Sequence, residues 1–450
     1  MARRPDAHIA GTDAATVERR VALRVLERVR GGAYADRAFA GEARRADLEG
    51  PARRQANRLA YGAVQRRRSL DYVIDAHLTN PRRVEPGVRD VLRLGAYELC
   101  YSDGVASAVV VDQAVRLTRS LPGEKRRRDA RAGLVNAVLR KVAADGRRRL
   151  DRIGDSTPEE AALRHSVPDW ISRALFASLG PDDARMVLAA ANEPPERAIR
   201  WNPLRGSREE FEALLPEGRW RRDPRIDEAY VIDGPFALED SPIWQEGRGM
   251  AQSRASLLPV VALDPRPGER ILDLCAAPGA KTTAIAARMG DQGTLVAVEP
   301  HAARARALQK VAGRLGATVD VIEGDGREVP LEAGFDAVLV DPPCTGLGVL
   351  SGRPDARWRR EEGDVAVLAR LQTELLGRAL TLVRPGGRVV YSTCTLLPAE
   401  NEDVVRGAGV PVVHITEQDP SLAHPHLSGA LRTLPGRDGT DGFFVARLVG

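Results

Sequence analysis

Two of the four cysteines in this chain stand in short motifs that could support covalent chemistry. Cys344 lies in Asp341-Pro342-Pro343-Cys344-Thr345-Gly346, and Cys394 lies in Ser392-Thr393-Cys394-Thr395. Each motif follows an apolar run typical of a buried strand, so both thiols are expected past the carboxyl ends of strands, where parallel sheets bind ligands. A free cysteine is usually a small buried hydrophobe, which is our interpretation of Cys100 in a predicted helix. Two thiols at one ligand-binding edge instead indicate nucleophilic chemistry by a thiolate.

A third motif joins a strand-like run to a helix-like run and reads Cys275-Ala276-Ala277-Pro278-Gly279-Ala280-Lys281. Its small residues would let a ligand approach the backbone, and a helix N-terminus offers free N–H groups. The nucleotide-phosphate loop G-x-x-x-x-G-K-[ST] does not fit, because Cys275 and Ala280 occupy its glycine positions. The dinucleotide pattern G-x-G-x-x-G is also absent, so an NTPase and a dehydrogenase are both disfavoured.

Two acidic residues follow the next strand-like runs. Glu299 ends the second run, where an acid typically accepts hydrogen bonds from ribose hydroxyls. Asp325 lies just beyond the third run, where it could meet an adenine amino group. Taken singly, each acid is equally typical of a helix cap or a turn. Together with the small-residue loop, they favour a ligand that contains adenosine.

Thiols beside such a ligand suit one difficult reaction, methylation of cytosine at carbon 5. This carbon is too weakly nucleophilic to attack a sulfonium methyl group. Addition of a thiolate to carbon 6 makes the ring enamine-like, so that carbon 5 can attack, and loss of the carbon-5 proton then releases the thiolate. The target base must leave its stack to be reached.

The segments that must position these residues differ in pattern, and they predict a multidomain chain. Residues 1–145 predict an all-α bundle, because apolar residues recur at helical spacing. Residues 146–262 predict an α+β connector, with strands at Arg197–Asn202 and Tyr230–Ile232. Residues 263–450 alternate between strands and helices, which predicts a doubly wound α/β domain. Its strand-like runs are Arg270–Leu274, Thr294–Val298, Val319–Ile322, Ala337–Val340, Arg388–Tyr391 and Phe443–Arg447.

The charge is divided along the chain. Residues 1–150 hold 32 lysines and arginines against 18 aspartates and glutamates, whereas the remainder holds 35 against 44. A basic N-terminal third on an acidic chain indicates a phosphate-rich partner such as RNA. With aromatic residues at only 4%, contacts to phosphates and RNA shape are favoured over base stacking.

Composition excludes several classes of protein. No apolar run approaches the ~18–20 residues that span a bilayer, and the N-terminus lacks the apolar core of a signal peptide. Four cysteines in 450 residues do not make a disulfide framework, so we expect reduced thiols and a cytoplasmic location. We expect neither a membrane partner nor a metal site, and we expect the protein to be a monomer.

The chain resembles a known family, the bacterial 16S rRNA (cytosine-C5) methyltransferases of the RsmB/Sun/Fmu type. The resemblance covers nearly the whole chain. It rests on the three motifs above, on Pro398-Ala399-Glu400-Asn401-Glu402 and on Gly439-Thr440-Asp441-Gly442-Phe443-Phe444. In the N-terminal segment, Leu92–Tyr97 and Gly133–Arg140 resemble the NusB-like RNA-binding fold.

The resemblance implies S-adenosylmethionine as methyl donor, a Rossmann-like catalytic domain and specific roles for residues. It implies that Cys394 is the nucleophile, that Cys344 assists product release, and that Lys281 and Asp341 lie near the target base. The donor would be held by Cys275, Ala276, Ala277, Pro278, Gly279, Ala280, Lys281, Glu299, Asp325 and Asp341.

Three positions depart from the usual pattern of this family. Pro342 stands where alanine is frequent, Glu299 where aspartate is frequent, and Ser253 where aspartate is common. The Pro-Cys pair is intact and the longer acid can still reach a diol, so only the role of the segment around Ser253 is put in doubt.

Two alternatives stay open at this point. The same chemistry could act on transfer RNA or on another ribosomal site, since one sequence does not decode substrate choice. A non-enzymatic NusB-like RNA-binding factor is the other alternative. Such a factor would be expected to have lost at least one of Cys394, Cys344, Asp341 or the donor loop, and none is missing.

Overall fold

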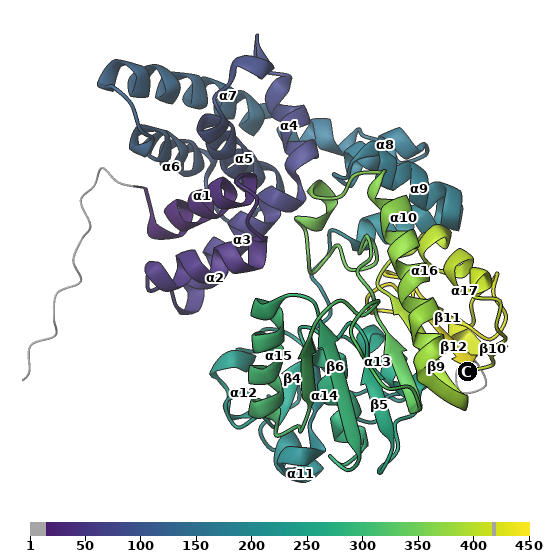
Figure 1. Cartoon of the computed structure of the whole chain (residues 1–450). Helices are drawn as coiled ribbons and strands as arrows, with labels where there is room; N and C mark the ends of the chain where they lie inside the picture. The colour runs from purple at the N-terminus through teal and green to yellow at the C-terminus, as the bar shows by residue number, and fades with distance from the viewer. Residues whose placement is uncertain (1–14, 416–419) are drawn as a thin grey trace, which may run out of the picture. The chain divides into compact units, whose positions relative to one another are not determined.

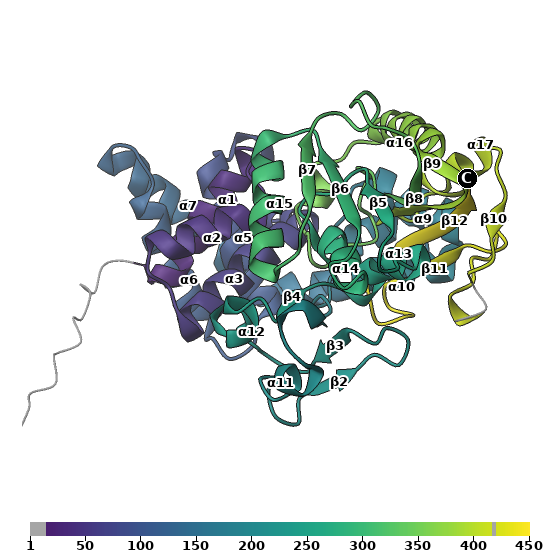
Figure 2. The same ribbon diagram turned by 60° about the horizontal axis from the view of Figure 1, so that its bottom comes forward.

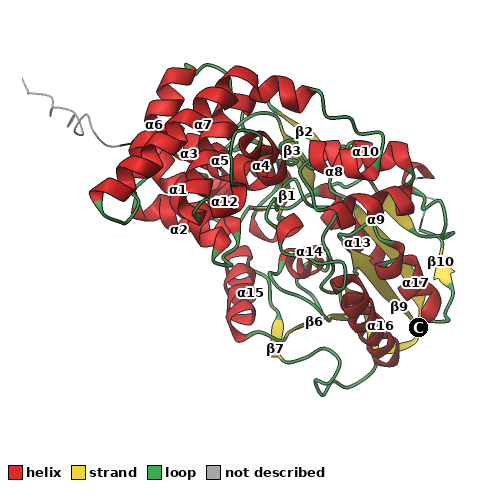
Figure 3. Ribbon diagram, turned by 90° about the horizontal axis from the view of Figure 1, so that it is seen from above, coloured by secondary structure: helices red, strands yellow, loops and turns green. Residues whose placement is uncertain are grey.

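The computed structural model describes residues 15–415 and 420–450, and these divide into two compact units. The first unit runs to Arg173 and also includes Arg353–Arg359; the second comprises Ala174–Gly352 and Arg360–Gly450. Among these residues, no helix is both long enough and apolar enough to cross a membrane. The three-segment division made from the sequence remains a prediction. The predicted fold classes are confirmed, since Figure 3 shows helices throughout the first unit and strands only in the second.

The first unit is a helical bundle, as the helical spacing of its apolar residues predicted. A single core joins them, including Val21 and Val25 of the first helix. Two glycines allow residues of the NusB-like motifs to pack closely. A Cβ on Gly62 would lie 2.0 Å from the Tyr97 ring, and one on Gly95 would lie 2.5 Å from Leu139. The helices are α1 (Val17–Arg30), α2 (Ala35–Arg45), α3 (Gly50–Gln65), α4 (Arg67–Asp75), α5 (Pro86–Tyr101), α6 (Ser107–Ser120), α7 (Lys125–Asp151) and α8 (Pro158–Arg164).

A short 3-10 turn from far along the chain, η4 (Ala356–Trp358), is part of this bundle. The Arg357 side chain is fully buried and donates to the carbonyl oxygens of Gln65, His165 and Ser166 at 3.2–3.3 Å. The indole of Trp358 donates to the Val64 carbonyl at 2.7 Å. Burial lowers the pKa of Arg357 to about 9. Nothing in the sequence pattern predicted this insertion.

The bundle also contains a buried histidine that should make its stability depend on pH. His165 is 7% exposed, and burial lowers its pKa from 6.5 to about 4. As pH falls below 6.5 the unfolded chain takes up the proton first, so stability present at neutral pH is lost between pH 6.5 and 4. At pH 5 this loss should be about 2 kcal/mol. His165→Gln should therefore show a smaller drop in melting temperature between pH 7.5 and 5 than the wild type.

Circular dichroism of the full chain at both pH values checks this. The exposed His414, changed to glutamine, is the control and should keep the wild-type drop. If the wild type and His165→Gln lose the same amount, the imidazole is not the titrating group.

The second unit opens with helices α9 (Asp169–Leu179, which begins in the first unit) and α10 (Pro181–Ala190) and a small antiparallel sheet. Two of the strands, β1 (Ala198–Trp201) and β3 (Ala229–Ile232), confirm predictions. The strands β2 (Trp220–Arg222) and β4 (Gly249–Ala251) were not predicted. The order is β2-β3-β1-β4, and the sheet and the short helices α11 (Arg208–Glu212) and α12 (Pro242–Gln245) lie together in Figure 2.

The large sheet of this unit has the order β10-β12-β9-β8-β5-β6-β7, with β11 paired to β12. Neighbouring strands from β7 to β9 are parallel, and β12 is antiparallel to β9. The strands that follow β5 in the chain lie on both sides of it in the sheet: β6 and β7 on one side, β8 and β9 on the other. The crevice at the carboxyl end of β5 is therefore the expected ligand site. The strands are β5 (Arg270–Asp273), β6 (Thr294–Glu299), β7 (Asp320–Glu323), β8 (Phe335–Val340), β9 (Val383–Thr393), β10 (Val412–Val413), β11 (Leu431–Thr433) and β12 (Phe443–Val449).

Helices cover both faces of the large sheet, because successive side chains of its strands point alternately into two apolar cores. Leu272 and Val338 face a core shared with α16 (Asp364–Leu382) and α17 (Glu402–Gly407). Ile271 and Leu339 face the core shared with α13 (Arg254–Leu263) and α14 (Ala280–Arg288). A further helix, α15 (Ala302–Leu315), contacts β6 and β7. Figure 1 shows these helices flanking the strands, as a doubly wound fold requires.

Candidate active site

The two motif cysteines meet beyond the carboxyl ends of β8 and β9. The Sγ atoms of Cys344 and Cys394 lie 3.3 Å apart, and the amide of Gly348 donates to the Cys394 carbonyl at 2.9 Å. The hydrogen bond with Cys394 and burial raise the pKa of Cys344 well above the usual value of 9.0. Cys344 therefore keeps its proton at neutral pH and can donate it to the sulfur of Cys394. This arrangement makes Cys344 the proton-carrying thiol of the pair.

Lys281 and Asp341, predicted to lie near the target base, form a partly buried ion pair beside the cysteines. The Lys281 Nζ is 2.6 Å from Asp341 Oδ2, and the two side chains are 11% and 26% exposed. Ser392, two residues before Cys394, donates to Asp341 Oδ1 at 2.8 Å. The ammonium also lies 5.1 Å from the Phe443 ring centroid. The sequence analysis assigned no role to Ser392, although its place in the cysteine motif marked it.

The small-residue loop forms the start of α14, as predicted. Gly279 is the residue before the helix, with φ +103°, and a Cβ there would lie 2.4 Å from Leu308. In the first turn, Thr282 donates to Asp273 Oδ2 at 2.7 Å. Burial raises the pKa of Asp273 to about 6 and that of Cys275 well above 9.0. Cys275 is therefore a protonated thiol at neutral pH and unsuited to be a nucleophile.

The two acids predicted to bind adenosine lie at the ends of β6 and β7. Glu299 is 2% exposed and accepts from the backbone amide of His301 at 3.1 Å. Asp325 is more open, and its Oδ1 accepts from both the amide and the side chain of Arg327 at 3.0 Å. That arrangement matches a turn residue, the alternative that the sequence left open for Asp325. The Arg327 hydrogen bonds lower the pKa of this aspartate.

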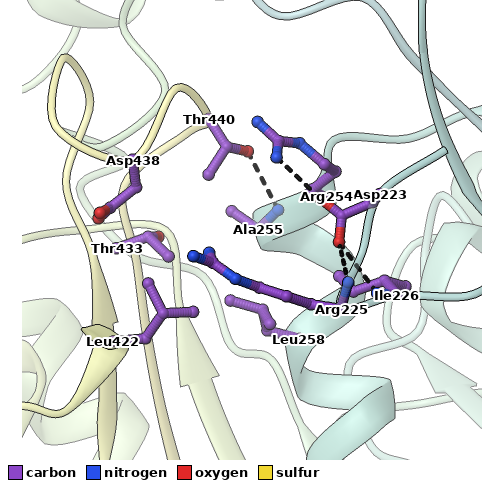
Figure 4. Close-up of a pocket in the computed structure, with 10 residues that line it drawn as sticks. All are labelled: Asp223, Arg225, Ile226, Arg254, Ala255, Leu258, Leu422, Thr433, Asp438 and Thr440. Atoms are coloured by element: carbon purple, nitrogen blue, oxygen red, sulfur yellow. Dashed lines mark hydrogen bonds and ion pairs between the residues drawn. The ribbon is translucent and has the colours of Figure 1, made fainter. Parts of the chain in front are cut away.

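A small cavity lies elsewhere in this unit, against the segment around Ser253 (Figure 4). Its volume of about 20 Å³ is room for one water-sized molecule, far too small for an adenosine ligand. On one side, Arg254 is held by Glu196, by Asp223 at 2.8 Å and by the Gly439 carbonyl at 2.7 Å. These contacts tie the connector to the Gly439–Phe444 motif, which gives the segment around Ser253 a structural role. In the part of the chain that the structure describes, no group of three or more His, Cys, Asp or Glu side chains is arranged to hold a metal ion.

Two family models match the chain. The model of the NusB family matches residues 16–144, and the model described as 16S rRNA methyltransferase RsmB/F matches residues 260–449.

Similar proteins match along most of the chain. A Synechocystis protein named "Probable ribosomal RNA small subunit methyltransferase B" is 33% identical over 453 residues, which is 96% of this chain and 98% of that protein. The Cronobacter sakazakii protein "Ribosomal RNA small subunit methyltransferase B" is 31% identical over 402 residues, covering 87% and 89%. The crystal structure of PH0851 matches with a TM-score of 0.81 and 27% identity, covering 96% of this chain and 98% of that one.

These matches confirm the resemblance found in the sequence motifs. The chain belongs to the 16S rRNA methyltransferase RsmB/F family and carries a NusB-family helical domain before its methyltransferase domain.

Proposed function

We propose that the protein transfers a methyl group from S-adenosylmethionine to carbon 5 of a cytosine in 16S rRNA, through a covalent bond between Cys394 and carbon 6. The observation that carries the proposal is the 3.3 Å separation of the Cys344 and Cys394 sulfurs next to the Lys281–Asp341 pair. Methyl transfer to an oxygen or an exocyclic nitrogen would need no thiol. Two thiols at the carboxyl edge of the sheet fit a reaction that needs a nucleophile and a separate group for release.

The residues divide the reaction between them. Cys394 attacks carbon 6 as a thiolate, which forms the S–C6 bond and pushes electron density to carbon 5. The Lys281 ammonium would stabilise the negative charge that develops on the ring, and Asp341 would hold that ammonium in place within the partly buried site. After carbon 5 has taken the methyl group, Cys344 assists removal of the carbon-5 proton. The electron pair of the broken C–H bond restores the ring double bond, and Cys394 leaves as a thiolate.

The donor side of the crevice fits S-adenosylmethionine by the chemistry of its groups. When bound, this molecule supplies an electrophilic methyl group. The buried carboxylate of Glu299 would accept from the ribose, and Asp325 would meet the adenine. The loop Cys275–Lys281 would lie along the ligand with the free N–H groups of α14, and the Asp341 carboxylate would lie on the methyl side.

Bisulfite sequencing of ribosomal and transfer RNA, from cells with and without the gene, tests reaction and substrate together. Loss of one protected cytosine in 16S rRNA is expected, in the cytoplasm where this RNA is made. If a transfer RNA cytosine loses protection instead, the chemistry stands and the substrate proposal is wrong. If no cytosine changes, the protein is not a cytosine-C5 methyltransferase in those cells, and a binding factor becomes the better description.

Binding of the RNA substrate should depend on the basic start of α7. Lys125, Arg126 and Arg127 are all exposed there, where they would contact phosphates. Removing two phosphate contacts, as in the double variant Lys125→Ala/Arg126→Ala, should weaken binding several-fold and reduce the slope of log K against log salt by about 2. Fluorescence anisotropy of 16S rRNA fragments with the full chain, across a salt series, measures both.

The matched control removes two arginines that are each paired with an acid on the same helix. These are Arg185, which pairs with Asp182, and Arg406, which pairs with Asp403. The double alanine variant at those positions changes the net charge equally but should keep the wild-type slope. Equal slopes for all three proteins would contradict a phosphate-binding role for α7.

A further inference from the structure

A buried dipeptide beneath the two cysteines has no part in the mechanism described so far. Glu400 ends the 3-10 turn η5 (Pro398–Glu400), and Asn401 precedes α17. Glu400 is 0% exposed and Asn401 is 2% exposed. A carboxyl group with no access to water is costly to bury unless hydrogen bonds satisfy it, so its partners show what the fold gains from it.

All the side-chain partners of Glu400 hold the residues on either side of Cys344. Its Oε1 accepts from the Thr345 amide at 2.9 Å and from Gln372 Nε2 at 3.0 Å, and its Oε2 accepts from the Thr345 hydroxyl at 2.5 Å. The same Gln372 nitrogen donates to the Pro343 carbonyl at 2.9 Å. The backbone before and after Cys344 is therefore fixed through a single carboxylate.

Asn401 does the same for Cys394. Its Oδ1 accepts from the Thr393 hydroxyl at 2.5 Å, and its Nδ2 donates to the Thr395 carbonyl at 3.1 Å. A hydrogen bond of 2.6 Å between the hydroxyls of Thr345 and Thr395 joins the two cysteine loops directly. Because Thr345 gives its proton to Glu400, the chain of donors runs from Thr395 through Thr345 to the carboxylate.

We propose that Glu400 is a positioning residue of the methyl-transfer reaction: it holds the Cys344 loop against the Cys394 loop and keeps Cys344 as the neutral, proton-carrying partner of the two thiols. The effect of Glu400 on catalysis rests on the proposed function, whereas its hydrogen bonds to the two cysteine loops do not. The charge of Glu400 also acts in the same direction as the hydrogen bond and the burial that raise the pKa of Cys344.

Glu400→Gln separates this role from packing, because glutamine has nearly the same shape. Its carbonyl oxygen can still accept from the Thr345 amide, but its NH₂ group cannot accept from the Thr345 hydroxyl. The hydroxyl loses its acceptor and Cys344 loses a neighbouring negative charge. We expect Cys344 to react about tenfold faster with iodoacetamide near neutral pH, with the pH profile of alkylation moved to lower pH. Turnover should fall about 10- to 100-fold, with the KM for RNA and the donor Kd within twofold of wild type.

Glu402→Gln is the matched control. Glu402 is also a buried glutamate, 5% exposed, only two residues away, but its carboxylate pairs with His424 at 3.1 Å. It should leave the alkylation profile and turnover unchanged. Alkylation is followed by peptide mass spectrometry, turnover by methyl transfer to 16S rRNA, and donor affinity by calorimetry, all with the full chain.

A wild-type alkylation profile and wild-type turnover in Glu400→Gln would overturn the proposal, and so would an equal effect of Glu402→Gln. If Glu400→Gln does not fold, Thr345→Val tests the same network from its other end. It keeps the Glu400 charge but removes the hydroxyl that joins the two loops, so turnover should fall as in Glu400→Gln, and wild-type turnover would overturn the proposal. If the wild-type protein methylates no cytosine, the proposed function fails, yet the alkylation profiles still decide whether Glu400 controls the thiols.

Discussion

Replacing Cys394 by alanine should lower methyl transfer by at least about a thousandfold while leaving donor binding intact, since nucleophile loss removes the covalent route itself. No other thiol can take its place. Cys344 lies 3.3 Å away, but its raised pKa keeps it protonated, and it is only 9% exposed. Cys275 is likewise held as a thiol by burial.

The measurement is transfer of labelled methyl groups to 16S rRNA under single-turnover conditions, with calorimetry for the donor. Cys100→Ala is the control, because Cys100 lies in the helical unit, where burial raises its pKa to about 12. This variant should keep wild-type activity. A Cys394→Ala protein that retained a tenth of wild-type activity would exclude Cys394 as the nucleophile.

The positions of the two cysteine motifs could be predicted from the sequence because both motifs stand at strand ends. An apolar run followed by a short polar motif fixes both the strand and the edge on which the motif lies. The structure accordingly brings Lys281, Asp341, Cys344 and Cys394 together from three segments that are far apart in the chain. The topology, which follows from the alternation of strands and helices, was enough to predict that the two cysteines meet. The place of Lys281 and Asp341 beside them was implied by the family resemblance.

Contacts that depend on the details of side-chain packing could not be predicted from the sequence. Strand β2 could not be predicted, because its three residues include Arg221 and Arg222 and show no apolar alternation. It lies at the edge of its sheet. Glu400 is acidic, and an acid in a short turn reads as a surface residue until the structure shows it to be fully buried. Arg357 is similar: a basic residue in a loop gave no sign that it would fill the interior of the helical unit.

The second prediction concerns release of the product. Cys344→Ala should trap the protein on its RNA, because the S–C6 bond forms as before while removal of the carbon-5 proton is slowed. Groups that transfer protons in this way typically contribute about 10²–10⁴-fold. The fraction of enzyme joined to RNA should therefore rise to most of the protein once substrate is in excess, and turnover should nearly cease.

The electrostatics of the pair explain why Cys344 can change its role during the reaction. Before attack, the hydrogen bond to Cys394 is the largest cause that raises the pKa of Cys344, so Cys344 holds its proton. Once the Cys394 sulfur is bonded to carbon 6 it carries no charge, and this cause disappears. Cys344 can then lose its proton to solvent more easily, and the resulting thiolate can accept the proton from carbon 5 at the stage when the reaction requires it.

A denaturing gel of Cys344→Ala with 16S rRNA and S-adenosylmethionine should show a protein band shifted by the mass of the RNA and removed by ribonuclease. The double variant Cys344→Ala/Cys394→Ala is the control and should show no shifted band, because the bond cannot form without Cys394. A shifted band in the double variant would mean that another residue is joined to the RNA. The absence of any band in the single variant, with methyl transfer continuing, would instead assign release to a group other than Cys344.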